Sequence, residues 1–135
     1  QGFRSIDEPG APSWFELHTR DYSRAVDFYR QVFRWDIDVF SDSDEMRYTV
    51  LKIGEDQLAG IMDVTGSLSE GTPGYWQVYF RTKDTDAAIA TVAKLGGQVI
   101  RPGEDTPYGR LAASADPMGA RFALLGPRAM PAQDA

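Results

Sequence analysis

Glu16 and His18 are the pair of residues best suited to acid–base chemistry, because His18 is the only imidazole in the chain. They lie in segment 14–19, where apolar and polar residues alternate as in a β-strand. Side chains two residues apart on a strand project from one face, so the carboxylate can orient the imidazole for proton transfer. Three roles stay open for His18: catalysis, contact with a ligand, or a hydrogen bond to a neighbour in the sheet.

The composition removes several other kinds of site. The chain has 135 residues, one His and no Cys, which excludes disulfides, thiolate metal sites, Cys–His pairs and a His-rich zinc site within one chain. Its net charge of −6 argues against nucleic acid or an anionic membrane as partner. No apolar run approaches the roughly 20 residues of a membrane span. We expect a soluble, cytoplasmic protein of one domain, or of two fused half-size units.

Two series of elements follow each other along the chain. Each begins with a strand and a helix and continues with three strands, and a linker rich in Gly and Pro separates the two at 65–74. In the second series, Pro102-Gly103 is expected to end a short strand. The predicted strands are 14–19, 35–40, 47–53, 57–64, 75–82, 98–101, 110–115 and 120–125, and the predicted helices begin at a Ser23 cap and span 85–95.

The order β-α-β-β-β therefore occurs twice. A shift of 63 residues aligns the two series without a gap and places the turn 54–56 on the turn 117–119. The shift also places Asp21 on Asp84. Each of these aspartates stands directly before a helix, so we interpret both as helix N-caps rather than as metal ligands.

A duplicated βαβββ unit with these motifs resembles the vicinal oxygen chelate superfamily of glyoxalase I, bleomycin-resistance proteins and extradiol dioxygenases. The resemblance covers residues 13–125 and is greatest to the glyoxalase-like branch, loosely called hydroxylases. It implies an α+β fold: one domain over 1–135, with units 13–64 and 75–126 forming a curved mixed sheet, a central cleft, and helices on the outer face. Its motifs are Asp21-x3-Ala25-x2-Phe28-Tyr29-x2-Val32-Phe33-x-Trp35, Phe80-x3-Asp84 before Leu95-Gly96-Gly97, and Asp116-Pro117-x-Gly119.

Family enzymes bind a divalent metal through His, Gln or Glu on the first and last strand of each unit. The resemblance assigns those positions to residues seven before each motif aspartate and four beyond the Gly of Asp-Pro-x-Gly. In this chain they are Trp14, Gly60, Gln77 and Ala123. Three of the four offer no metal-binding atom, so we expect neither a metal nor another cofactor, and small residues are expected to leave volume for a ligand.

Strand alternation predicts which residues face that cleft. Trp14, Glu16 and His18 share one face, whereas Phe15 and Leu17 point toward the helix. Trp14 and Tyr79 are expected to form a stacking wall for a planar ligand, and Arg81 to bind an anion or to pair with Glu16. Leu58 is placed on the cleft face as well. The predicted ligand-binding set is Trp14, Glu16, His18, Gln77, Tyr79, Arg81, Met62 and, as a lid, Tyr108.

The first functional hypothesis is a metal-independent, glyoxalase-like protein that binds a small molecule in the cleft between the units. The alternative is a lyase, isomerase or dioxygenase-type enzyme that uses His18 and Glu16 or a displaced metal site. A third idea makes the chain a structural half of a tandem or dimeric assembly. The expected partners are a small-molecule ligand and a second copy in a homodimer, with neither nucleic acid nor membrane.

Overall fold

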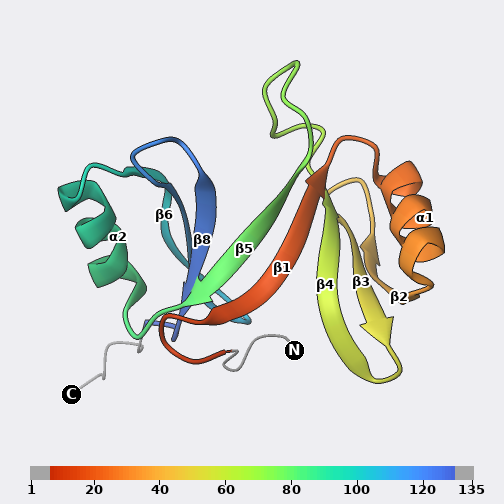
Figure 1. Cartoon of the computed structure of the whole chain (residues 1–135), viewed down its shortest axis with the longest axis horizontal. Helices are drawn as coiled ribbons and strands as arrows, with labels where there is room; N and C mark the ends of the chain where they lie inside the picture. The colour runs from red at the N-terminus through yellow and green to blue at the C-terminus, as the bar shows by residue number, and fades with distance from the viewer. Residues whose placement is uncertain (1–6, 130–135) are drawn as a thin grey trace. The chain divides into compact units, whose positions relative to one another are not determined.

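The computed structural model describes residues 7–129, which form two helices and eight strands (Figure 1). The predicted α+β class and the twice-repeated order are confirmed. The elements are β1 (Pro12–Thr19), α1 (Tyr22–Phe33), β2 (Asp36–Asp42), β3 (Arg47–Ile53), β4 (Asp56–Asp63), β5 (Tyr75–Arg81), α2 (Thr85–Lys94), β6 (Gln98–Thr106), β7 (Gly109–Ala115) and β8 (Arg121–Gly126).

One compact unit spans Trp14–Gln77 and has the strand order β2-β3-β4-β1. β1 and β4 are parallel, while β3 is antiparallel to both β2 and β4. The register places Glu16 opposite Gly60 and His18 opposite Met62. Directly opposite residues share a face of a sheet, so these four positions lie on the same side.

The other face of this sheet carries α1 and the apolar core. Leu17, Leu51 and Ile61 are buried there against Val26 of the helix, and Phe15 is partly buried against the same cluster. Phe15 and Leu17 therefore face the helix, as the alternation predicts. Burying one large aliphatic side chain contributes roughly 1.5–3 kcal/mol, so this cluster holds β1 in register against β4.

Leu58 is an exception to the predicted alternation. The pairing of β3 with β4 shifts register between Leu51 and Lys52, so that β4 carries one extra residue at this point. Leu58 consequently packs against the core cluster beneath α1. Its predicted place on the cleft face is wrong, because strict alternation does not hold across a bulge.

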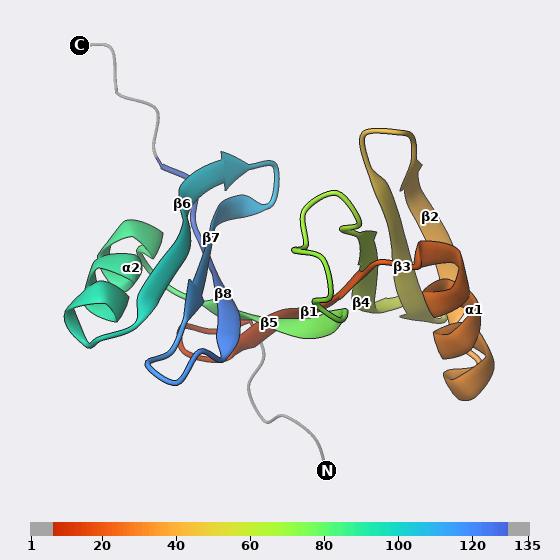
Figure 2. The ribbon, with the colours of Figure 1, turned by 90° about the horizontal axis from the view of Figure 1, so that it is seen from above.

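A second compact unit contains Val78 and the residues after it, together with the short stretch that ends at Ser13. Its strand order is β5-β8-β7-β6, and α2 packs on β6, β7 and β8 (Figure 2). The register forms a continuous row across the four strands, in which Arg101 lies opposite Ala113, Ala113 opposite Ala123, and Ala123 opposite Tyr79. The cleft that the resemblance predicts between the two units stays a prediction.

β6 is longer than the sequence predicts. Pro102-Gly103 was expected to end it at Arg101, yet the strand continues to Thr106. The ladder between β6 and β7 shifts register twice, between Val99 and Arg101 and between Arg101 and Glu104. The second shift contains Pro102-Gly103, so the strand continues beyond these two residues. Proline lacks the amide proton that a regular ladder requires, and a bulge removes that requirement locally.

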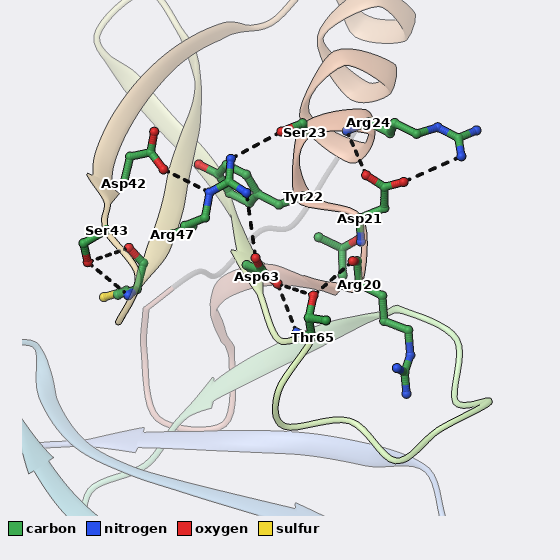
Figure 3. Close-up of polar contacts among 12 residues, drawn as sticks. Arg20, Asp21, Tyr22, Ser23, Arg24, Asp42, Ser43, Arg47, Asp63 and Thr65 are labelled. Carbon is green, nitrogen blue, oxygen red and sulfur yellow. Dashed lines mark hydrogen bonds and ion pairs between the residues drawn. The ribbon is translucent and has the colours of Figure 1, made fainter.

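The two helices begin at the aspartates that the repeat aligns. The side chain of Asp21 accepts a hydrogen bond from the amide of Arg24 (Figure 3). The side chain of Asp84 accepts one from the amide of Ala87. The interpretation of both aspartates as N-caps is confirmed. Ser23, predicted as the cap of α1, lies inside its first turn and instead accepts a hydrogen bond from Arg47.

The segment between β4 and β5 is irregular, and the end of β1 contacts it. Arg20 donates from Nε to the carbonyl of Thr72 at 2.6 Å and from a second nitrogen to the carbonyl of Ser69. In the part of the chain that the structure describes, neither helix is long and apolar enough to cross a membrane.

Candidate functional site

Four side chains of the Trp14–Gln77 unit form a hydrogen-bonded chain on the face opposite α1. Trp14 donates from Nε1 to the hydroxyl of Tyr48 at 2.9 Å, and that hydroxyl donates to one carboxylate oxygen of Glu16 at 2.7 Å. Nε2 of His18 lies 2.8 Å from the other oxygen of Glu16. Glu16 and His18 are each only 8% exposed. Both oxygens of a buried carboxylate are thus hydrogen-bonded, which offsets the cost of removing the charge from water.

Tyr48 covers Gly60 and has no role in the sequence prediction. A Cβ atom built on Gly60 would lie 1.8 Å from the Tyr48 hydroxyl oxygen and 2.3 Å from the ring carbon that bears it. The expectation that Gly60 leaves volume for a ligand is therefore wrong, because the tyrosine ring fills this place. A glycine in the interior of a strand signals the close approach of another group, and this was the signal that could have found Tyr48.

His18 is buried, and only one of its two ring nitrogens has a hydrogen-bond partner among the described residues. Its ring packs at a tilt against Tyr75, with centroids 5.1 Å apart. Because the Glu16 carboxylate accepts a hydrogen bond from Nε2–H, we assign Nδ1 as the unprotonated, acceptor nitrogen. No described residue hydrogen-bonds to Nδ1. The side chain is 11% exposed. An imidazole whose far nitrogen is held by a carboxylate has the arrangement of a general base.

The second unit holds a hollow where the first unit is filled. It lies on the sheet face that contains Tyr79 and Ala123 and has a volume of about 160 Å³. Ala113 and Ala123 are small and lie next to each other in the cross-strand row, between Arg101 and Tyr79. Ala123, which is 1% exposed, lines the hollow, and the ligand volume expected at this position stays a prediction. The lining residues are Tyr79, Arg101, Glu104, Thr106, Leu111, Ala112, Ala113 and Ala123.

Arg101 and Glu104 are functional candidates that the sequence prediction missed. Ending the strand at Pro102-Gly103 left Glu104 outside the predicted strand 98–101. With β6 continuous, Arg101 lies opposite Ala113 and Glu104 opposite Leu111. The repeat indicates that the two units differ here, since a shift of 63 residues from Tyr48, which covers Gly60, gives Leu111. Leu111, which is smaller than a tyrosine, lines the hollow.

Arg81 pairs with Asp7 inside its own unit. Its guanidinium donates to the carboxylate of Asp7, with Nε 2.9 Å from the oxygen, and the alternative pair of Arg81 with Glu16, which would join the two units, stays a prediction. The hydrogen bond from Arg81, with a second from Ser13, holds the pKa of Asp7 below its usual range. The positive charge of Arg81 is consequently compensated in the described structure.

The remaining predicted site residues lie in separate places. Gln77 is buried on β5, and Met62 on β4 lies opposite both His18 and Tyr48. Tyr108 is 67% exposed in the turn between β6 and β7. The stacking wall of Trp14 and Tyr79 and the lid role of Tyr108 stay predictions.

A larger and shallower hollow of about 600 Å³ lies on the other face of the second unit. Phe80 and Phe122 meet edge to face at its floor, with ring centroids 6.2 Å apart. Its lining has no pair of acidic and basic groups of the kind found at Glu16 and His18, and its Arg81 is bound to Asp7. The sheet faces that carry the Glu16–His18 pair and the small hollow are therefore better candidates for a functional site than this larger hollow.

Three of the four positions where the resemblance places metal ligands offer no atom that binds a metal. Gly60 has no side chain and is covered by Tyr48, Ala123 has only a methyl group, and the indole of Trp14 is a donor already used on Tyr48. Among residues 7–129, no group of three or more His, Asp or Glu side chains is arranged to hold a metal ion.

Comparison with known proteins gives both sequence relatives and structural neighbours. The chain is 37% identical over 128 residues to the anthracycline biosynthesis protein DnrV of Streptomyces peucetius, covering 86% of this chain and 46% of that protein. DauV of Streptomyces sp. strain C5 matches with the same identity and coverage. The chain thus spans about half the length of these curated relatives.

Methylmalonyl-CoA epimerase from Mycobacterium tuberculosis has a similar fold, with a TM-score of 0.60, 16% identity and coverage of 87% of this chain and 88% of that one. At such identity the likeness shows the fold alone. A family model matches residues 11–124, almost the whole described chain. The chain therefore belongs to the Glyoxalase/Bleomycin resistance protein/Dioxygenase superfamily.

Proposed function

We propose that this chain is a metal-independent small-molecule-binding domain that seats a planar ring of its ligand over Ala113 and Ala123. The observation that carries the proposal is the hollow of about 160 Å³ beside Tyr79. An apolar cavity of about 150 Å³ is large enough for benzene, so this hollow suits one ring of a larger molecule. Tyr79 offers that ring an aromatic neighbour.

The relatives support a planar ligand. DnrV and DauV are named as anthracycline biosynthesis proteins, and anthracyclines are built on fused, flat rings. The chain covers 46% of each of those proteins, so the correspondence concerns that part of them alone. Metal independence is supported by the donor chemistry of Gly60 and Ala123, since neither supplies an atom that a divalent cation binds.

The first prediction uses 3-hydroxy-2-naphthoate, a flat two-ring anion, as the probe. At about 0.3 kcal/mol per non-hydrogen atom its dissociation constant should be about 1 mM. Methyl NMR spectra should show saturable shifts at Leu111 and Ala113. Ala123→Leu places a side chain in the hollow and should weaken binding at least tenfold.

Ala93→Leu on the exposed surface of α2 is the matched control and should bind the probe as the unmodified chain does. Thermal unfolding of both variants shows whether each remains folded. Absence of saturable shifts in the unmodified chain, or undiminished binding to a folded Ala123→Leu variant, contradicts the proposal.

Acid–base catalysis is a second candidate function, and one observation favours it. Glu16 fixes Nε2 of His18, and no described residue occupies Nδ1, so the imidazole has a nitrogen available to accept a proton from a bound molecule. Glu16 would then stabilise the imidazolium. Neither residue needs a metal for this step, so this candidate is compatible with metal-independent binding.

A further inference from the structure

Arg101 is an uncompensated cation at the edge of the hollow. Arg81 pairs with Asp7, and Arg110 pairs with Asp86 at 3.1 Å and with Asp105 at 3.3 Å. Arg101 also lines a concave part of this unit, yet no described residue forms an ion pair or a side-chain hydrogen bond with it. A guanidinium beside an apolar surface gains most from a ligand that brings a negative charge.

The backbone on both sides of Arg101 departs from a regular β-ladder. Register shifts stand on both sides of it, before and after its pair with Ala113. Bulges redirect side chains and are common beside binding sites. Three strand spacings of about 4.8 Å place Arg101 and Tyr79 about 14 Å apart along the sheet, with the two alanines between them. A flat ring over the alanines thus has an aromatic group at one edge and a cation at the other.

We propose that Arg101 selects ligands that carry a carboxylate or another anionic group on the edge of the ring. This inference rests on the proposed function and names the ligand class of the same hollow. Arg101 replaces Arg81, the residue that the sequence predicts for this role. A guanidinium can hold a carboxylate through two parallel hydrogen bonds, which fixes the orientation of the ring as well as its charge.

Two polar neighbours narrow the class further. Glu104 and Thr106 line the same hollow, and Glu104 lies opposite Leu111 in the ladder. The carboxylate of Glu104 disfavours a dianion and accepts a hydrogen bond from a ligand hydroxyl. The ligand class is therefore a hydroxylated aromatic monoanion, with the acid group toward Arg101 and a hydroxyl toward Glu104.

The test compares 3-hydroxy-2-naphthoate with neutral 2-naphthol by methyl NMR titration. The unmodified chain should bind the naphthoate at least tenfold more tightly than 2-naphthol. Arg101→Gln should abolish that preference while leaving the affinity for 2-naphthol within twofold. Arg101→Lys should recover part of the preference, because it restores the charge without the planar fork. Lys94→Gln, in the last turn of α2, removes the same charge away from the hollow and should leave the preference unchanged.

The outcomes separate the two proposals. If the unmodified chain binds 2-naphthol as tightly as the naphthoate, or if Arg101→Gln keeps the preference, the role of Arg101 is refuted while ring binding stands. If Lys94→Gln weakens the naphthoate as much as Arg101→Gln does, the preference is a long-range charge effect and the assignment also fails. If neither probe binds the unmodified chain, both proposals fail.

Discussion

Replacing Gly60 by alanine is expected to lower the free energy of unfolding by about 3 kcal/mol, because overpacking a filled site costs 1–3 kcal/mol and displaced buried hydrogen bonds add to this. The new Cβ would lie 1.8 Å from the hydroxyl oxygen of Tyr48, so the ring must leave its position between Trp14 and Glu16. The loss should appear in urea denaturation and as a fall in Tm of roughly 10 °C.

Gly66 supplies the matched control. A Cβ on Gly66 would meet no atom within 4 Å, so Gly66→Ala should leave stability nearly unchanged. The double variant Gly60→Ala/Tyr48→Leu copies the Ala123 and Leu111 pair of the second unit. In the Tyr48→Leu background, Gly60→Ala should cost less than about 1 kcal/mol. An equal cost in both backgrounds would show that Tyr48 is not what the new methyl group meets.

Replacing Glu16 by alanine should lower the free energy of unfolding by about 3 kcal/mol. The reason is that removing one member of a buried hydrogen-bonded network leaves its partner groups buried without a hydrogen bond. His18 and Tyr48 would each lose the oxygen to which they are bonded. Glu55→Ala, in the exposed turn between β3 and β4, removes the same charge and should have an effect within about 0.5 kcal/mol. Chemical denaturation measures both, and equal small losses would contradict the buried network.

The same residues test the second candidate function. A naphthyl β-ketoester in D₂O should exchange its acidic carbon-bound proton faster with the unmodified chain than in buffer, as NMR records. His18→Asn should remove this acceleration while the ester still binds. Exchange at the buffer rate with the unmodified chain would refute acid–base catalysis by His18.

The sequence predicts the architecture well because its information is periodic. Alternation in segment 14–19 places Leu17 on the helix side, and the 63-residue repeat aligns the caps Asp21 and Asp84. Both features depend on local chain geometry, which a sequence displays directly. Cytoplasmic location and homodimer formation stay predictions.

The residues of the site are harder to predict from the sequence, because the pairing of neighbouring strands determines which side chains meet there. Tyr48 covers Gly60 only through the pairing of β3 with β4, and Arg101 reaches the hollow only because β6 passes Pro102-Gly103 with bulges. The pairing of Arg81 with Asp7 depends on a contact between distant parts of the chain. Register and irregular strand geometry are the quantities that residue patterns leave open.

Binding of 3-hydroxy-2-naphthoate before and after chelation tests most directly whether this domain holds its ligand without a metal. The protein is treated with a chelator, its metal content is measured by mass spectrometry, and the Leu111 methyl signal is followed during titration. We expect well below one metal per chain and the same dissociation constant before and after treatment. Loss of binding on chelation, with recovery on adding Mn²⁺, Ni²⁺ or Zn²⁺, would contradict it.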